Sequence, residues 1–274
     1  MNLSEAVNFT FENRDSWING SGASTARINC NHCLRILGDI PVEEIESKHF
    51  AAITKQLKEE GKKPATINRV NAALSTVINE LRQHGHKLDE PVFKRQKEPK
   101  GRPGFYTDEQ LEALLEASKA ERDYFLLHDS IIFATKTGCR QGEMLDLRVD
   151  DLNLDELTIT FRDVKQGGDH IVAIHEDLLP VLIRRMEYAV GSELFPWNGK
   201  DQLLRAFKRC QQAAGLPENT LCWHELRHTV ATMLCKKGVP LRTVMGVLGH
   251  KNINTTLRYA HAVDTAVRDA IDLL

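Results

Sequence analysis

Apolar residues recur at helical spacing through the first third of the chain, and no strand-like alternation interrupts them. The clearest stripe places apolar side chains on one helix face at Ile67, Val70, Leu74, Val77, Ile78 and Leu81. Pro64 before this stripe and Gly85 after it predict where the helix begins and ends. An earlier helix is predicted to be capped by Ser24 or Thr25 and to end at Gly38. This region is therefore predicted to form a small helical domain.

A stretch rich in proline and basic residues follows this helical region. Three prolines and a glycine lie between residues 91 and 103, which predicts a linker. The basic run taken alone favours a solvated linker, and contact with a DNA backbone is the alternative. The DNA-backbone candidates in this run are Lys94, Arg95, Lys97, Lys100 and Arg102. We divide the chain into a helical domain at residues 1–90, a basic linker at residues 91–104 and a second domain at residues 105–274.

The pattern after the linker combines helices with a short pair of strands. Thr107 and Gln110 form an imperfect capping box ahead of an apolar helix face. Two β-prone runs, at residues 157–161 and 170–174, are joined by a glycine-containing turn that places Lys165 at or near its tip. The predicted fold class is therefore mostly α, with a small antiparallel β hairpin in the second of two domains.

A stretch near the C-terminus joins short helical stripes to groups that bind or protonate oxyanions. His224 and Arg227 are three residues apart, so they share one face of a predicted helix. A second short stripe ends directly before His250, and Tyr259 lies on the helix predicted next. Two histidines, an arginine and a hydroxyl nucleophile in one segment indicate phosphoryl chemistry.

Composition and charge exclude some classes of protein. The chain of 274 residues has no run of about 18 apolar residues, so no membrane span is expected. Its N-terminus lacks the basic and apolar regions of a signal peptide, and its six cysteines are irregularly spaced, which together favour a cytoplasmic protein. The net charge of -2 neither indicates nor excludes a nucleic-acid partner, because a local basic stripe supplies the attraction to phosphate.

Each polar residue also has a simpler interpretation when it is taken alone. Arg140 could pair with Glu143 one helical turn on, and Lys165 could be an ordinary exposed lysine. His228 is expected to pack or to form a hydrogen bond inside its helix rather than to bind metal. The pair Cys30 and Cys33 lacks a second cysteine pair or nearby histidines, so buried thiols are favoured over a metal site.

Taken together, the residues resemble the tyrosine recombinases, which form the phage integrase family. The resemblance spans roughly Thr107 to the C-terminus and depends on the order of five motifs. These motifs are TGCRQGEMLDL around Arg140, KQGG at Lys165, HELRHTVAT from His224, VMGVLGH ending at His250 and NTTLRYAH around Tyr259. The helical N-terminal region is similar in style to the family's core-binding domain, which is weaker evidence.

The resemblance implies a role for each matched side chain. Tyr259 would attack the scissile DNA phosphate and form a 3′-phosphotyrosyl bond. Arg140, Arg227 and His250 would bind the phosphate oxygens, and Lys165 would protonate the leaving 5′-oxygen. His224 would exchange a proton with the tyrosine or orient the phosphate, and Glu143 would hold Arg140. No metal, cofactor or ATP is implied.

The resemblance also implies partners and an assembly. Double-stranded DNA would be the substrate, in the integration or excision of a mobile element, and a monomer in solution would form a homotetramer on synapsed DNA. The apolar face of the last residues would then pack on the same domain or dock on a neighbouring protomer. Its members are Ala262, Val263, Ala266, Val267, Ala270 and Ile271. Tyr259 follows a loop with little apolar anchoring, so we expect it to lie away from Arg140, or to be less ordered, without DNA.

Two alternative functions remain open at this point. A type IB topoisomerase would use the same tyrosine and arginines, although the two-domain plan and the motif ending at His250 favour a recombinase. A non-catalytic DNA-binding protein of integrase descent would not need all six side chains, and all six are present.

Overall fold

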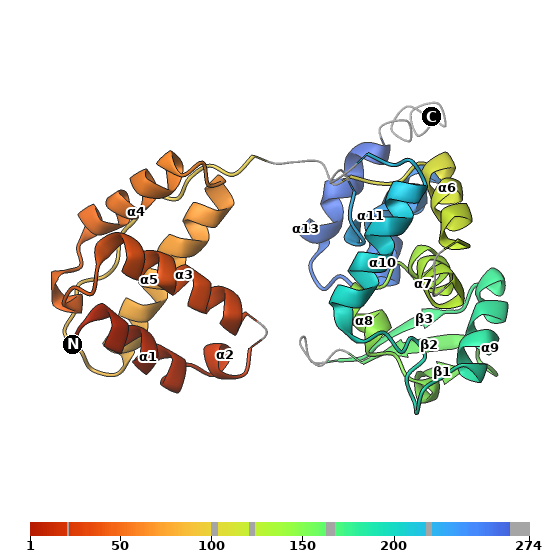
Figure 1. The fold of residues 1–274 in the computed structure, drawn as a ribbon, viewed down its shortest axis with the longest axis horizontal. Coiled ribbons are helices and arrows are strands. Elements are labelled where there is room, and N and C mark those ends of the chain that lie inside the picture. Colours follow the sequence, from red (N-terminus) through yellow and green to blue (C-terminus); the bar gives the residue numbers. More distant parts are fainter. Residues whose placement is uncertain (21, 100–103, 121–123, 163–167, 218–220, 264–274) are drawn as a thin grey trace, which may run out of the picture. The chain divides into compact units, whose positions relative to one another are not determined.

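The structure is a computed structural model that describes all residues except 21, 100–103, 121–123, 163–167, 218–220 and 264–274. The chain divides into two compact units, Met1–Lys100 and Gly101–Leu274, and each is described by itself (Figure 1). In the part of the chain that the structure describes, no helix is long and apolar enough to cross a membrane.

Unit 1 is built from helices alone in its described residues (Figure 1). In chain order they are α1 (Leu3–Asn13), α2 (Asp15–Ile18), α3 (Ala23–Leu37), the 3-10 helix η1 (Val42–Glu44), α4 (Ser47–Glu59) and α5 (Pro64–Gln83). The prediction that Ser24 or Thr25 caps α3 is wrong. Gly22 takes the cap position and already has near-helical backbone angles, so both residues lie inside the first turn. Gly38 ends this helix with a positive φ of 76°, as predicted.

Helix α5 supplies the longest apolar face of unit 1. Its predicted stripe is buried throughout, and Val70, Val77 and Leu81 have no exposed surface. Cys30 and Cys33 on α3 face the same core, each with 1% exposure, and burial raises the pKa of Cys30 to about 12. The two thiols are therefore neutral core groups.

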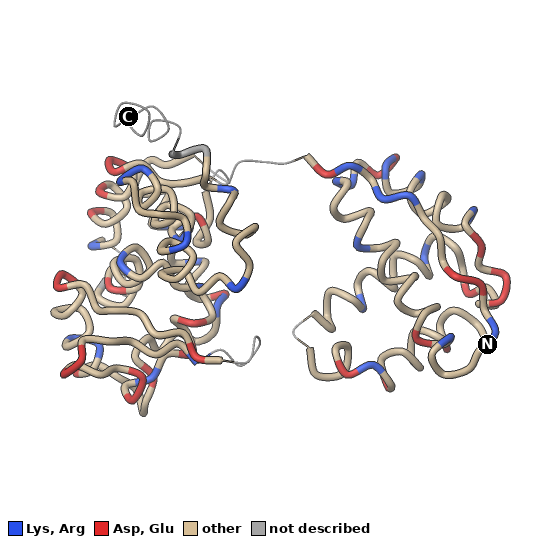
Figure 2. The backbone as a smooth tube through the Cα atoms, turned by 180° about the vertical axis from the view of Figure 1, so that it is seen from behind, with Lys and Arg blue, Asp and Glu red and all other residues tan. Residues whose placement is uncertain are grey.

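The first part of the predicted linker is attached to unit 1. The side-chain amide of Asn68 on α5 donates to the carbonyl of Gln96 at 2.9 Å and accepts from its N–H at 2.8 Å. The ring of Phe93 stacks on Phe50 with 5.3 Å between the centroids. These contacts hold the segment before residue 100 on unit 1. This segment carries several basic positions (Figure 2).

Unit 2 is mostly helical with one small sheet. Its helices are α6 (Asp108–Ser118), α7 (Tyr124–Thr137), α8 (Gln141–Leu145), α9 (Leu179–Glu187), α10 (Gly199–Ala213), α11 (His224–Lys236), α12 (Leu241–Leu248) and α13 (Ile253–Thr256). The 3-10 helices are η2 (Val149–Asp151), η3 (Glu176–Leu178) and η4 (Leu257–Val263). The fold class predicted from the sequence is confirmed.

The sheet has three antiparallel strands in the order β1-β2-β3. Strands β2 (Thr158–Phe161) and β3 (His170–Ala173) form the predicted hairpin, with Phe161 opposite His170. Strand β1 (Leu152–Asn153) was not predicted, because two residues are too few to show an alternating pattern. Lys165 lies outside the described residues.

Two close contacts attach α11 and α12 to the rest of unit 2. The N–H of the buried Tyr106 donates to Thr229 Oγ1 at 2.8 Å, directly before the predicted capping box of Thr107 and Gln110, which the structure confirms. At the end of α7, a Cβ added to Gly138 would lie 2.8 Å from a methyl carbon of Leu248. Helix α7 therefore ends directly against the end of α12.

Candidate active site

Arg227 lies in the first turn of α11, and only 3% of its surface is exposed. Its Nη1 donates to the carbonyl of Gly138 at 2.7 Å, and its Nη2 donates to the carbonyl of Leu248 at 2.5 Å. A guanidinium carries five N–H donors, so further donors stay available to a phosphate. Burial, with the charge of Arg140, lowers the pKa of Arg227 to about 10, which leaves it charged at neutral pH.

Arg140 occupies the N-cap position of α8. Its backbone N–H donates to Glu143 Oε2 at 2.6 Å, and its guanidinium forms an ion pair with the same carboxylate. The contact expected between Glu143 and Arg140 is therefore present. Nη2 of Arg140 also lies 3.5 Å from the carbonyl oxygen of Gly249. Both arginines thus meet at the C-terminal carbonyls of α12, where the helix dipole presents partial negative charge.

His250 follows Gly249, which ends α12 in a left-handed conformation with φ 61°. Its Nδ1 forms a hydrogen bond of 2.9 Å with Thr256 Oγ1, and its other ring nitrogen, Nε2, is not used in this bond. Burial lowers the pKa of His250 to about 4, and the charges of Arg227 and Arg140 act in the same direction. The imidazole is therefore neutral at pH 7.

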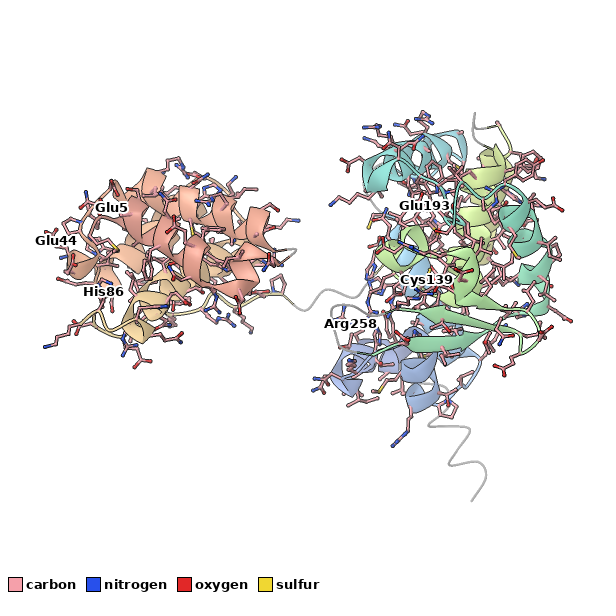
Figure 3. All side chains as sticks on the ribbon, turned by 90° about the horizontal axis from the view of Figure 1, so that it is seen from below. Glu5, Glu44, His86, Cys139, Glu193 and Arg258 are labelled. Atoms are coloured by element: carbon pink, nitrogen blue, oxygen red, sulfur yellow. The ribbon has the colours of Figure 1, made fainter. Side chains whose placement is uncertain are left out.

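Tyr259 on η4 is 3% exposed and belongs to an apolar cluster of unit 2. The other buried members of this cluster are Ala231, Cys235, Val244 and Leu248. Burial raises the pKa of Tyr259, while the charge of Arg258, which is exposed beside it, opposes this shift (Figure 3). The loop before Tyr259 is exposed, as expected, and α11 and α12 supply the apolar contacts of the tyrosine itself.

The hydroxyl of Tyr259 forms a hydrogen bond with Nδ1 of His228. His228 is buried, as expected of a histidine that packs inside the protein, and its hydrogen-bond partner comes from η4 rather than from its own helix. Burial lowers the pKa of His228 to about 4, so its ring is neutral at pH 7. The four-residue spacing of His224 and His228 was the available signal, because it places both rings on one helix face.

His224 opens α11 and is the exposed member of this histidine pair. Its ring packs edge-on against His228, with 4.7 Å between the ring centroids. Partial desolvation lowers the pKa of His224, and the charge of Arg227 contributes in the same direction. The structure therefore places His224 next to His228, the hydrogen-bond partner of Tyr259.

The structure brings five of the six predicted catalytic residues into unit 2 as one constellation. Arg140, Arg227 and His250 surround the C-terminal turn of α12, and Arg227 is near enough to Tyr259 for its charge to oppose the rise in the pKa of the phenol that burial causes. The sixth residue, Lys165, lies outside the described residues. So do Lys100 and Arg102, whereas Lys94, Arg95 and Lys97 are exposed on unit 1.

One polar group beside this constellation, the thiol of Cys139, belongs to the core of unit 2. Cys139 precedes Arg140 and is buried inside unit 2, where burial raises its pKa to about 12 (Figure 3). Across the described ranges, no three histidine, cysteine, aspartate or glutamate side chains group as metal ligands would.

A comparison with protein families identifies the group to which the chain belongs. The model described as "Phage integrase family" matches residues 105–265, which is more than half of the chain. The chain is a member of the phage integrase family. It is therefore a tyrosine recombinase, an enzyme of DNA recombination from a family that needs neither metal nor ATP.

Relatives of this integrase-family chain carry the same description. A tyrosine recombinase of Pseudothermotoga lettingae is 30% identical over 255 residues, which cover 88% of this chain and 87% of the relative. The tyrosine recombinase XerD of Listeria monocytogenes is 28% identical over 243 residues, covering 80% of this chain and 78% of the relative.

Solved structures share the fold of this integrase-family chain. Lambda integrase residues 75–356, solved as a dimer bound to a COC′ core site, match with a TM-score of 0.79 at 21% identity and cover 93% of this chain and 97% of that one. The Tn1549 transposon integrase in complex with transposon right end DNA matches with a TM-score of 0.80 at 19% identity and 99% coverage of both chains.

Proposed function

We propose that this tyrosine recombinase cleaves and rejoins duplex DNA at specific sites through a 3′-phosphotyrosyl bond, in the integration or excision of a mobile element. The observation that carries the proposal is the convergence of Arg140, Arg227 and His250 on the end of α12, with Tyr259 in the apolar cluster to which α11 and α12 both contribute. A phosphate needs several fixed donors, and these residues supply them in one place.

The arginines bind the non-bridging oxygens of the scissile phosphate. Arg227 is aimed by two backbone carbonyls, and Arg140 is held by Glu143, so both guanidinium groups are oriented before DNA arrives. A fixed donor that meets developing charge contributes about 3–4 kcal/mol to the transition state. His250, neutral at pH 7, donates one further hydrogen bond.

Tyr259 Oη forms a bond to phosphorus as the bond from phosphorus to the 5′-oxygen breaks. Lys165 gives its proton to the leaving 5′-oxygen, and the phenol proton passes to the pair formed by His224 and His228. The buried hydroxyl is bonded to His228, so Tyr259 must exchange this contact for the phosphate. The covalent bond conserves the energy of the phosphodiester, and rejoining therefore needs no ATP.

Unit 1 binds the DNA backbone near the target site. Asn68 and Phe93 hold the segment that carries Lys94, Arg95 and Lys97, and all three side chains are exposed. Basic side chains along a constrained segment can follow a row of phosphates and release their counterions. These residues add affinity without reading the sequence of the bases.

The active assembly is a homotetramer on two synapsed DNA sites. Lambda integrase, a structural neighbour, was solved as a tetramer bound to a Holliday junction. The apolar positions at the C-terminus of this chain would supply an exchange contact between protomers that closes into a ring. Most of these positions, residues 264–274, lie outside the described residues.

A trap for the covalent intermediate tests the reaction directly. Nicked duplexes with a random central sequence release the cleaved fragment, so a phosphotyrosyl adduct accumulates and survives SDS. We expect the wild-type chain to form this adduct and Tyr259→Phe to form none. Tyr188→Phe is the matched control, because Tyr188 is 61% exposed at the end of α9. Sequencing of the recovered adducts identifies the preferred site.

Two outcomes of this experiment would contradict the proposal. Absence of an adduct from the wild-type chain, or an adduct that persists in Tyr259→Phe, would exclude the phosphotyrosyl mechanism at Tyr259. Relaxation of supercoiled plasmid without any recombinant product would instead favour a topoisomerase of type IB.

A further inference from the structure

His170 lies in contact with the candidate active site, although no motif of the sequence analysis includes it. It is the first residue of β3 and pairs with Phe161 across the hairpin. The two rings stack with 6.0 Å between their centroids and 27° between their planes. Phe161 is 3% exposed and packs edge-on against Phe133 of α7. The imidazole is therefore supported from the core side of the sheet.

The hydrogen bond of His170 reaches the last turn of α12. Its Nε2 lies 2.8 Å from the carbonyl oxygen of Gly246, and a carbonyl can only accept. Nε2 must therefore carry the hydrogen, which settles which ring nitrogen is the donor. The bond joins residues far apart in the sequence and connects the sheet to the helix that precedes His250.

Three carbonyls at the end of α12 receive side-chain donors from three different elements. His170 on β3 bonds to Gly246, Arg227 on α11 bonds to Leu248, and Arg140 at the start of α8 approaches Gly249. Two of these donors belong to the proposed phosphate site. His170 is the third contact of the same turn.

The ring of His170 also explains why a glycine stands before His250. A Cβ added to Gly249 would lie 2.7 Å from His170 Nδ1 and 2.9 Å from its Cε1, which is closer than real Cβ atoms approach. Gly249 also has a positive φ of 61°, which favours glycine by itself. The turn therefore fits the imidazole, and the imidazole limits the positions that the turn can take.

We propose that His170 is a positioning residue of the recombination site, which holds the C-terminal turn of α12 so that His250 and the two arginines face one phosphate. The proposal rests on the proposed function. It assigns to β3 a direct part in the geometry of the phosphate site, through the hydrogen bond to Gly246 and the contact with Gly249.

The first test needs no DNA and uses NMR signals of the imidazole of His250 in the full chain. Four charged or titratable groups face His250 and hold its pKa low together with burial: Arg227, Arg140, Arg258 and His228. In His170→Phe, which keeps a ring against Phe161 and loses the donor, we expect the pKa of His250 to rise from about 4 toward its ordinary value. His170→Gln keeps an amide donor at a similar reach, so it should restore the low pKa.

The second test measures the rate of adduct formation on the nicked duplex selected by the wild-type chain. We expect His170→Phe to lower this rate about tenfold, the effect of removing one hydrogen bond, while His170→Gln recovers most of it. The matched control is His175→Phe, an exposed histidine just beyond β3 whose hydrogen bond stays local, to the N–H of Asp177.

A double-mutant cycle separates positioning from general destabilisation. If His170 acts through His250, the reductions in rate caused by His170→Phe and His250→Ala will not add in the double variant, whereas independent effects would add. An unchanged His250 signal in His170→Phe would overturn the proposal. Equal reductions in His170→Phe and His170→Gln, or additive reductions in the cycle, would also overturn it.

Failure of this inference can be told apart from failure of the proposed function. If the wild-type chain forms no adduct, the phosphotyrosyl proposal fails, while the His250 signal still decides whether His170 positions the turn. If the wild-type chain forms the adduct and His170→Phe matches it in both rate and His250 pKa, only the inference about His170 fails.

Discussion

At the residue scale, burial keeps the groups around the nucleophile neutral. Tyr259 and His228 are 3% and 9% exposed and share a hydrogen bond, and His250 is 9% exposed nearby. The pKa of the phenol is raised, and the pKa values of both histidines are lowered to about 4. Burial keeps the His228 ring neutral at pH 7, so its Nδ1 can accept the hydrogen of the phenol, and the same burial makes the ring a weaker base than a free histidine.

The lowered pKa values predict that unit 2 loses stability in mild acid. A histidine whose pKa falls from 6.5 to about 4 on folding stabilises the fold above pH 6.5, and this stability disappears as the pH falls toward 4. Each histidine would contribute a loss of at most about 2 kcal/mol between about pH 7 and pH 5. Chemical unfolding at these two pH values measures the difference.

His228→Phe provides the comparison for this pH effect. Phenylalanine cannot be protonated, so the variant should lose less free energy of unfolding between the two pH values than the wild-type chain does. The exposed control His175→Phe should keep the wild-type difference. An identical pH dependence in His228→Phe and wild type would show that protonation of His228 does not oppose folding.

At the element scale, the site is assembled where three helix ends meet. Helix α7 ends directly before Gly138, α8 begins after Arg140, and α12 ends directly before Gly249. Helix ends expose carbonyls and N–H groups that have no partner within the helix. At this junction the free carbonyls bind Arg227 and Arg140, so the same bonds satisfy the helix ends and aim the phosphate-binding groups.

A methyl group at Gly138 should disturb this junction. Gly138 has a φ of 65°, and an added Cβ would lie 2.8 Å from Leu248 and 3.2 Å from Val230. We expect Gly138→Ala to destabilise unit 2 by about 1–3 kcal/mol and to slow adduct formation, because the carbonyl bound by Arg227 must shift. Thermal unfolding and the nicked duplex measure the two effects.

Gly142 offers the matched control for this substitution. It lies in α8, and an added Cβ would meet nothing within 4 Å. Gly142→Ala should therefore leave unfolding unchanged or raise the free energy by up to about 1 kcal/mol, as expected for alanine in a helix. Equal decreases of stability in the two variants would contradict the steric argument.

At the scale of the whole molecule, two compact units share the proposed work. Unit 2 holds the groups that we propose to be catalytic, and unit 1 carries the exposed basic segment at residues 94–97. The contacts of Asn68 and Phe93 make this segment part of the surface of unit 1. Substitutions in unit 1 can therefore alter the proposed contacts with the DNA backbone without changing the phosphate site of unit 2.

Neutralising the basic segment should weaken DNA binding and lower its salt dependence. For each of Lys94, Arg95 and Lys97 that binds a phosphate, substitution by glutamine should reduce the slope of log K against log salt by about 0.9. Binding of a fluorescent duplex to the triple glutamine variant at several salt concentrations measures the slope. Lys48→Gln is the control, because Lys48 forms an ion pair with Glu46 at 3.1 Å. An unchanged slope in the triple variant would remove these residues from the DNA interface.

Removal of the C-terminal apolar positions tests the proposed assembly. A chain that ends after His261 keeps Tyr259 and its apolar cluster, so we expect it to retain adduct formation on single sites. It should lose the ability to bring two DNA sites together, as measured by the mass of the protein–DNA complex. Synapsis equal to that of the full chain would contradict a role for these residues between protomers.

Much of the fold follows from local signals that the sequence carries. The stripe from Ile67 to Leu81, with Pro64 before it, predicts α5 correctly, and the capping box at Thr107 predicts the start of α6. These signals work because a helix needs only neighbours three or four residues away. The cap of α3 and the two-residue strand β1 were missed, because glycine backbone angles and short pairings leave no periodic pattern.

The sequence by itself determined the family, the mostly helical fold and the catalytic side chains that we propose, because motif order and helical period are written along the chain. Only the tertiary structure decided which groups touch these side chains. The bond between Tyr259 and His228, and that between His170 and Gly246, join residues on different elements. Such contacts depend on how helices and strands pack, and local spacing holds no record of that packing.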